Sequence, residues 1–523
     1  MYKRIYLLKF NFLLVTAMLA ALMAATAWTS HNAFAHFPYA ENPGFVRMDM
    51  RYLAYMPEAR KLTPAPIEGN AKSVPVLMYH GITRTDDSPI PADGYSVSPE
   101  TFKDHMFALK RAGYTAITTT ELEGFLLAGK ELPDRSVLIT FDDGRKDSFF
   151  PADPVLRALN YKATMFVITK FSLYNESVFY LHDRELEYMH RSGRWELQSH
   201  GKDDHEHYEI NEDEEQGIFL TNKLWLPGEG RLETDDEYLR RVRAELEISK
   251  QELDDRYGIN VTSFAFPFGD FGDRETNYPG SKDVLMSQVR AVYKLSFFQH
   301  GADTRFTHNH PAQFANDTFA HVYRVTVNST WSGDKLVSYL EQGRAKPLPY
   351  HDAMDTDAGW IRAWNNAHFA DSRMRLTPIA TEAGAGAVLD GTYTWGNYSL
   401  RADVGVNDGT SVYVWVRFQD DANFAACNFG DGFLHIEESV GGVKRVIEGT
   451  REVGDLPNRT FTVGVDVVGR NVTCLIDGVP VISTQYLDPS LSHGGIGLKT
   501  WNDQVNVAKM DAYGLSVVPL DVG

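Results

Sequence analysis

The chain has 523 residues, more than one ordinary hydrophobic core organises, so we expect two or three domains. Hydrophobic residues make up 43% of the chain and charged residues 23%, the proportions of a soluble globular protein. The formal net charge of −19, from 51 basic and 70 acidic residues, argues against nucleic acid or an anionic membrane surface as the main partner.

The first 35 residues have the pattern of a targeting segment. Basic residues within positions 3–9 precede an apolar run over 12–28, and Ala33-Phe-Ala35 resembles a cleavage site. We therefore expect an exported protein, secreted, periplasmic or on the cell surface, with residues 1–35 as a signal peptide. An uncleaved signal anchor is the alternative, because the apolar run is only slightly short for a spanning helix. Such an anchor would attach the protein to a membrane.

Strands and helices alternate from residue 74 onward. The first strand, 74–79, ends at His80, and Ser98-Pro99 begins the first helix. Strands separated regularly by helices are typical of parallel βαβ units, and this many units predict a barrel. Further strands are predicted at 114–117, 137–141, 163–169, 195–199, 264–267, 291–297 and 321–327, and further helices at 121–127, 153–159, 184–191 and 234–257.

The pattern changes after about residue 350. Short segments of alternating polar and apolar residues, such as 412–417 and 472–477, are separated by glycine and Asn/Asp turns. This pattern predicts an antiparallel β-sandwich. The prolines within 346–351 favour a boundary there. We predict an irregular lead-in over 36–73, a barrel over 74–345, a linker over 346–358 and a sandwich over 359–523.

The two cysteines, Cys427 and Cys474, lie in different strand-like segments of the sandwich. Export permits a disulfide between them, and two free buried thiols are the alternative. No histidine or acid stands beside either cysteine in sequence, so we do not predict a thiol catalyst.

Two adjacent carboxylates, Asp142 and Asp143, follow the apolar strand 137–141 and precede Gly144. Neighbouring acids raise each other's pKa, so such a pair indicates a bound cation or proton-transfer chemistry. Ligands of α/β folds lie at the carboxyl ends of strands, where this pair stands. A surface Asp-Asp-Gly turn is the alternative interpretation.

Two histidines stand at the end of another predicted strand. His200 follows strand 195–199, and His205 follows in a loop in which Gly201 lets both rings face one cation. His207 is a rival to His205 as the second ligand. Two imidazoles and one carboxylate bind a borderline divalent ion with open positions, and a second carboxylate nearby can act as general base. These residue types predict metal-assisted hydrolysis of an acyl bond.

Taken together and in this order, these motifs resemble those of polysaccharide deacetylases, the NodB-homology group or carbohydrate esterase family 4. The resemblance rests on Thr-Phe-Asp-Asp-Gly at 140–144, on Ser-His and the second histidine within 199–205, and on Phe-Ala-Phe-Pro-Phe-Gly at 264–269. Residues 76–80 resemble the usual entry strand of this family. The resemblance covers about residues 73–343 and implies a distorted (β/α) barrel, typically with seven strands.

The resemblance also implies roles for the polar residues. Asp142 matches the catalytic base, and Asp143, His200 and His205 match the ligands of one divalent metal ion, zinc, with cobalt or nickel as alternatives. The spacing of the two histidines resembles the branch that deacetylates exported β-1,6-linked N-acetylglucosamine polymers. The family's late Leu-x-x-His motif, which often supplies a general acid, is not visible in this sequence.

Four further residues are candidates for the substrate groove. Pro267 stands where the family usually has an arginine motif and would shape a wall of the groove, with a structural turn as the alternative. Arg324 resembles a recurring arginine of the last strand that orients a carboxylate. His80 would line the site or make a structural hydrogen bond. Trp225, in an insertion over 209–233, would stack on sugar or pack against the barrel.

The sandwich resembles laminin-G or concanavalin-like jelly rolls, on residues 395–400, 414–418, 476–480 and 494–499. That resemblance implies glycan binding or a spacer role. For the whole chain we expect an exported, metal-dependent hydrolase that removes N-acetyl groups from an N-acetylglucosamine-containing polysaccharide and releases acetate. A polysaccharide O-acetyl esterase and a catalytically inactive glycan-binding surface protein are the alternatives.

Overall fold

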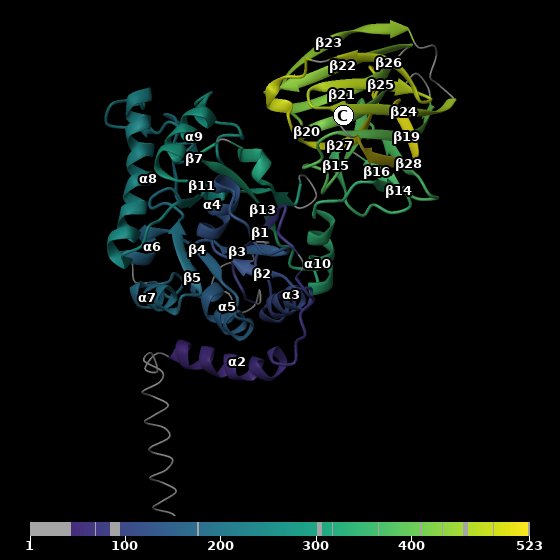
Figure 1. Ribbon diagram of the computed structural model, residues 1–523. Coiled ribbons are helices and arrows are strands. Elements are labelled where there is room, and N and C mark those ends of the chain that lie inside the picture. The colour runs from purple at the N-terminus through teal and green to yellow at the C-terminus, as the bar shows by residue number, and fades with distance from the viewer. Residues whose placement is uncertain are drawn as a thin grey trace, which may run out of the picture.

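The computed structural model describes residues 43–520, apart from residues 68, 84–94, 175–176, 301–305, 316, 365, 408–410, 431, 453–458 and 485. Two domains lie side by side (Figure 1). The first, purple to teal, is a barrel surrounded by helices, and the second, green to yellow, is an all-β sandwich. The signal segment predicted for residues 1–35 lies outside the described residues.

Seven parallel strands close into a ring at the centre of the first domain. Around the ring each strand pairs with the next in the order β1, β3, β4, β5, β10, β11 and β13, and β13 pairs again with β1. The predicted seven-stranded (β/α) barrel is confirmed. The ring strands are β1 (Val74–Tyr79), β3 (Ser136–Phe141), β4 (Ala163–Val167), β5 (Trp195–Ser199), β10 (Ser263–Ala265), β11 (Leu295–His300) and β13 (Ala320–Thr326).

Two short strands pair with the ring where β1 and β3 lie next to each other. β2 (Thr115–Ile117) pairs in parallel with β3, and β12 (His308–Asn309) pairs antiparallel with β1. The interior of the barrel is filled by apolar side chains that alternate with outward-facing ones. Because Ala320 and Val322 of β13 belong to this interior, the period of two places Arg324 on the same inner face. The interior set includes Val76, Leu138, Phe166, Ala265, Phe297, Ala320 and Val322.

Helices cover most of the outer surface of the barrel (Figure 1). Their ends follow local signals: Thr234 and Glu237 form a capping box at the start of α8, and Gly258 ends it in the left-handed conformation. No helix within the described ranges is long and apolar enough to cross a membrane. The helices are α2 (Pro43–Ala59), α3 (Pro99–Arg111), α4 (Thr119–Ala128), α5 (Lys146–Leu159), α6 (Thr169–Leu173), α7 (Asp183–Ser192), α8 (Asp235–Tyr257), α9 (Ser281–Val292) and α10 (Gly333–Gln342).

Two segments predicted to be irregular contain regular structure. The lead-in over 36–73 includes α2, because Phe45 at its start packs among Phe149, Phe150 and Tyr188 of the barrel domain. The linker over 346–358 includes the short strand β14, which pairs with the last strand of the sandwich. In both places tertiary contacts organise a segment whose prolines suggested irregular chain.

The second domain consists of two antiparallel sheets packed face to face. One sheet has the order β16, β17, β28, β19, β24, β25, β26, with β14 also paired to β28, and the other has the order β15, β18, β27, β20, β21, β22, β23. The predicted sandwich is confirmed. The first sheet comprises β14 (Tyr350–Asp352), β16 (Asn366–Phe369), β17 (Met374–Thr377), β19 (Tyr398–Asn407), β24 (Arg459–Val468), β25 (Asn471–Ile476), β26 (Val479–Thr484) and β28 (Lys509–Pro519). The second comprises β15 (Trp360–Trp364), β18 (Gly384–Leu389), β20 (Ser411–Asp420), β21 (Asn423–Gly430), β22 (Phe433–Val440), β23 (Val443–Glu452) and β27 (Gly495–Trp501).

A disulfide joins the two sheets through the core of the sandwich. Cys427 of β21 is bonded to Cys474 of β25, and their Cα atoms lie 5.9 Å apart. Both residues are fully buried among the apolar side chains that the sheets share. The sequence left a disulfide and two free thiols open, and the structure has the disulfide.

The sandwich covers the flank of the barrel formed by β11 and β13. The described part of the crossover between these strands, residues 306–315 and 317–319, contains no α-helix. Instead, the amide and hydroxyl of Thr307 donate hydrogen bonds of 3.0 and 2.7 Å to the buried carboxylate of Asp390 in the sandwich. The ring of His310 stacks on that of Tyr393 at 5.0 Å. The crossover therefore docks onto the second domain.

We predict that replacing both cysteines, Cys427→Ser with Cys474→Ser, lowers the free energy of unfolding of the sandwich by about 2–4 kcal/mol. The reason is that the bond closes a loop between residues 47 apart, which restricts the unfolded chain. Urea titration followed by tryptophan fluorescence measures the change, and wild-type protein treated with a reductant is the control. Equal midpoints for oxidised wild type and the double variant would contradict the prediction.

Candidate metal centre

The two adjacent acids after strand β3 differ in backbone conformation and in the groups that they contact. Asp142 is 1% exposed and follows the last residue of the strand, whereas Asp143 adopts a positive φ of 72°. A positive φ is unfavourable for a residue other than glycine, and such strain is concentrated at functional sites. Gly144 continues the turn with a φ of 66°. The sharp turn lets the neighbouring carboxylates reach separate partners.

Asp142 forms a buried ion pair with Arg324 across the barrel interior. Nη1 and Nη2 of Arg324 donate hydrogen bonds of 2.6 and 2.8 Å to the two carboxylate oxygens, and Arg324 is fully buried. Burial alone would raise the pKa of Asp142, but the Arg324 guanidinium, with His200 and His80, outweighs it and lowers that pKa. Asp142 is therefore ionised at neutral pH.

Asp143, His200 and His205 converge on one point. Their ligand atoms all lie within 4.8 Å of one another. Nε2 of His200 is 3.5 Å and Nε2 of His205 is 4.0 Å from Oδ1 of Asp143, and the two imidazole centroids are 4.3 Å apart. His200 Nε2 is also 3.9 Å from Oδ2 of Asp142, which places the fourth residue beside the cluster. The structure thus brings together all four residues that the sequence singled out.

Hydrogen bonds to the other ring nitrogens direct both Nε2 atoms toward Asp143. Nδ1 of His200 lies 2.8 Å from the carbonyl oxygen of Ala265, and Nδ1 of His205 lies 3.0 Å from Oδ1 of Asp204. The carbonyl oxygen of Ala265 can only accept, so Nδ1 of His200 donates to it and Nε2 points at Asp143; Nδ1 of His205 donates to Asp204 when that acid is ionised, which leaves the Nε2 lone pair for a cation. Burial and the neighbouring His200 lower the pKa of His205 well below its usual value, so its ring is neutral.

This donor set fits a divalent metal ion. Nε2 of His205 is buried and has no hydrogen-bond partner among the described residues, which is costly unless another group occupies the position. Two neutral imidazole nitrogens and one carboxylate oxygen are typical ligands of zinc and similar ions. Three protein ligands leave positions open for water and substrate.

The loop after β5 is built around the buried Asp204. Gly201 has a positive φ of 77°, and a Cβ atom at this position would overlap the Asp204 carboxylate. Glu245 of α8 accepts hydrogen bonds of 2.5 and 2.9 Å from the amides of Lys202 and Asp203. Burial raises the pKa of Asp204 to about 8. Gly201 and Glu245 therefore shape the loop that holds the side chain of Asp204 beside His205.

The remaining candidates of the sequence lie around this cluster. His80 follows β1, and its Nδ1 is buried without a hydrogen-bond partner among the described residues. His207 is exposed and is not part of the converging group. Pro267 begins a short 3-10 turn, Pro267–Gly269, directly after β10. Trp225 is half-buried on the small hairpin of β8 (Trp225–Leu226) and β9 (Arg231–Leu232). Their roles in a substrate groove stay predictions.

Sequence reasoning missed four residues close to the cluster. Nη1 of Arg145 lies 3.8 Å from Oδ2 of Asp143, and the ring of Phe268 lies 5.8 Å from that of His205. Burial, followed by the charge of Asp143, raises the pKa of Tyr180 to about 12. The fourth is Asp204, for which a signal existed, since an acid directly before a metal-binding histidine can orient its ring.

A comparison with protein families places the cluster in a known context. Residues 129–281 match the family model described as polysaccharide deacetylase, and this range includes β3, β4, β5 and β10 with all three converging residues. The chain carries a polysaccharide deacetylase domain. The resemblance drawn from the sequence motifs is thereby confirmed for the barrel.

Two relatives named as deacetylases match parts of the chain. Poly-beta-1,6-N-acetyl-D-glucosamine N-deacetylase of Escherichia coli (strain K12) is 24% identical over 187 residues, which are 34% of this chain and 28% of that protein. The enzyme of the same name from Staphylococcus epidermidis is 34% identical over 113 residues, 21% of this chain and 39% of that protein. The chain therefore spans well under half the length of these relatives.

Solved structures of deacetylases resemble the same half of the chain. A de-N-acetylase from Aggregatibacter actinomycetemcomitans aligns over 51% of this chain and 99% of its own, with 18% sequence identity and a TM-score of 0.42.

We predict that Asp204→Ala weakens zinc binding about 10- to 100-fold, the usual effect of removing a carboxylate that orients a metal-binding histidine. Competition with a fluorescent chelator measures the affinity. Asp203→Ala is the matched control, because this neighbouring carboxylate is 41% exposed and pairs with Lys170 instead. Equal zinc affinities for the two variants would show that Asp204 does not orient His205.

Proposed function

We propose that this chain is an exported, metal-dependent deacetylase that removes N-acetyl groups from an N-acetylglucosamine-containing polysaccharide and releases acetate. The observation that carries the proposal is the convergence of Asp143, His200 and His205 beside the ion-paired Asp142 within a polysaccharide deacetylase domain. Export rests on the N-terminal segment, whose basic residues, apolar run and Ala-Phe-Ala sequence are typical of a signal.

Asp143, His200 and His205 would hold one divalent cation, with zinc as the best fit to two imidazoles and one carboxylate. When bound, such an ion supplies a Lewis acid that polarises the acyl carbonyl and lowers the pKa of water. The protein contributes the orientation of the ligands, through Ala265 and Asp204, and an enclosed position at the carboxyl ends of the strands.

Asp142 would act as general base. Its carboxylate is ionised and lies next to the ligand cluster, so it can accept a proton from the attacking water. Arg324 holds both carboxylate oxygens, which fixes the orientation of the base and keeps it from binding the cation as a second acidic ligand. Adjacent acids thus have different roles, one binding the metal and the other accepting a proton.

The substrate class is argued from the relatives and from the rim of the site. The matched enzymes of Escherichia coli and Staphylococcus epidermidis act on poly-β-1,6-N-acetyl-D-glucosamine, and we propose a polymer of this kind as substrate. Pro267 and Trp225 would contribute walls of the groove. His80, whose buried Nδ1 has no hydrogen-bond partner in the described part of the chain, would face the bound acyl group.

The test is acetate release from N-acetylated chitooligosaccharides and from a β-1,6-linked polymer. Zinc-loaded protein is expected to release acetate, and protein treated with a chelator is expected to lose this activity and regain it when zinc is returned. Asp142→Asn is expected to retain zinc and lose turnover. Loss of zinc in this variant would reverse the roles of the two acids. Release from O-acetylated polymer alone would favour the esterase, and binding without release would favour an inactive glycan-binding protein.

We predict that Arg324→Met moves the acid limb of the pH–rate profile to higher pH. Arg324 lowers the pKa of Asp142, so its removal raises that pKa, and the ionised base is then present only at higher pH. Arg324→Lys keeps a positive charge and is expected to shift the limb less. An unchanged acid limb in Arg324→Met would mean that Asp142 does not set it.

A further inference from the structure

The outer face of the seven-stranded sheet of the sandwich carries a cluster of aromatic side chains far from the metal centre in sequence. Trp364 of β15 and Trp501 of β27 stack with centroids 5.4 Å apart and planes inclined by 24°. Trp415 of β20 lies beside Phe424 of β21 at 5.9 Å. We call these four residues, with Tyr413 of β20, the aromatic platform. Trp364 and Trp501 are only partly buried, so the platform is open to solvent.

Two glycines of β18 make room for the platform. A Cβ atom at Gly386 would lie 2.7 Å from the ring of Trp415, and one at Gly384 would lie 2.5 Å from the ring of Trp364. Both glycines belong to β18, whose residues pair with β27 and β15. Because glycine has no side chain, the indole rings of Trp364 and Trp415 lie directly against the backbone of β18 at these two positions. The flat surface is therefore a built feature of this sheet.

A buried lysine occupies the centre of the platform. Nζ of Lys499 lies 4.6 Å from the ring centroid of Tyr413, 5.1 Å from that of Trp364 and 5.4 Å from that of Trp501. Lys499 is 7% exposed, and among the described residues its ammonium makes no hydrogen bond or ion pair. Aromatic faces stabilise the charge but accept none of its hydrogen bonds well. The site therefore presents a cationic donor, the Lys499 ammonium, without an acceptor among the described residues.

An open cavity of about 330 Å³ is lined by Trp364, Trp415, Phe424, Lys499 and Trp501. Asp421 and Lys444 stand at its edge together with the platform. Trp415, which also lines this cavity, is 3% exposed, and its buried Nε1 has no hydrogen-bond partner among the described residues. Stacking surfaces combined with unused donors are the features that a protein uses to bind a polar ring with apolar faces.

We propose that the aromatic platform is a second saccharide-binding site, which takes a neutral, N-acetylated sugar chain. Pyranose faces would lie on Trp364 and Trp501, and hydroxyl or acetamide oxygens would accept hydrogen bonds from Lys499. Two lysines, Lys444 and Lys499, line the cavity against one carboxylate, that of Asp421, so a glucosamine ammonium would meet a net positive charge there. The site therefore favours acetylated over deacetylated sugar, a preference whose relevance to catalysis rests on the proposed function.

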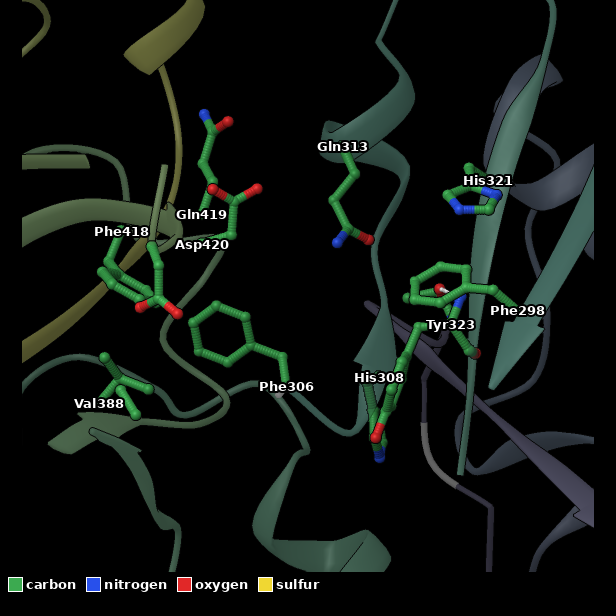
Figure 2. A pocket seen from close by; sticks show the side chains of 13 residues that line it. Phe298, Phe306, His308, Gln313, His321, Tyr323, Val388, Phe418, Gln419 and Asp420 are labelled. Carbon is green, nitrogen blue, oxygen red and sulfur yellow. Dashed lines mark hydrogen bonds between the residues drawn. The ribbon is translucent and has the colours of Figure 1, made fainter. Parts of the chain in front are cut away.

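The platform continues into a pocket between the two domains. Ala363 and Asp421 line both the platform cavity and this pocket of about 100 Å³. Figure 2 shows Phe418 and Asp420 of the sandwich on one side of the pocket, across from His321 of β13 on the other. A chain lying along the platform would thus be directed toward the flank of the barrel.

One loop connects this pocket with the rim of the metal centre. Phe271 packs on His321 at 4.8 Å, and Phe268, three residues earlier, packs on His205 at 5.8 Å. A sugar chain held by the sandwich therefore lies on the side of the barrel that shares a loop with the metal centre. This placement suits a site that holds unreacted polymer close to the metal centre.

The experiment is calorimetric titration of the full chain carrying Asp142→Asn with N-acetylated chitohexaose and with its fully deacetylated form. Within this background, Trp364→Ala is expected to weaken binding of the acetylated hexamer about three- to tenfold at one of two sites. Lys499→Gln keeps the volume of the side chain and is expected to weaken the same site. Tyr486→Ala, which removes a 74% exposed aromatic ring from the segment after β26, is the matched control and is expected to change nothing.

Three results would overturn the proposal: a single binding site, unchanged affinity in both Trp364→Ala and Lys499→Gln, or equal binding of the deacetylated hexamer. Thermal melting of each variant separates a local loss of binding from unfolding, and Lys499→Gln covers the case in which Trp364→Ala does not fold. Binding at the platform by a protein that releases no acetate would support this site while refuting the deacetylase. Acetate release with no binding at the platform would do the reverse.

Discussion

The buried ion pair between Arg324 and Asp142 is the interaction on which the arrangement of the metal centre depends. An uncompensated carboxylate inside the barrel would be strongly destabilising, and two adjacent ones more so. Arg324 neutralises one acid from inside the ring, and a cation would neutralise the other from outside it. Each carboxylate then has its own positive counter-charge, which is why Asp142 and Asp143 can stand next to each other. The pair also fixes which oxygen atoms remain available for chemistry.

Closure of the barrel creates that pair. Arg324 and Asp142 are 182 residues apart, and they meet because β1 pairs with both β13 and β3, which brings the last strand of the ring next to the strand that carries the acids. The histidines arrive from β5 by the same geometry, since parallel strands present their carboxyl ends on one side. The order of the strands in the ring therefore brings together site residues that are far apart in the sequence.

The sequence was sufficient where the signal was local. Asp142, Asp143 and His200 could be found because they follow recognisable strands, and His205 because it stands in the loop after His200. The alternation of strands and helices predicted the barrel that brings them together. Arg324, the bidentate partner of Asp142, could be suspected from its place in the last strand, but the sequence does not predict the geometry of the ion pair. Helix α2 was missed because packing of Phe45 on α5 and α7 stabilises a segment rich in prolines. The disulfide and the surroundings of Lys499 depend on which strands pair, and spacing alone does not specify this.

Docking of the β11–β13 crossover onto the sandwich has a consequence for how the two domains can vary. In a (β/α) barrel a helix usually follows each strand and shields its flank. In the described part of this crossover, Thr307 and His310 instead find their partners, Asp390 and Tyr393, in the second domain. The sandwich is thus part of the wall of the barrel rather than an appendage on a flexible tether. Recombination could not exchange it for an unrelated module without leaving that flank unshielded, so the two domains are expected to be inherited as one unit.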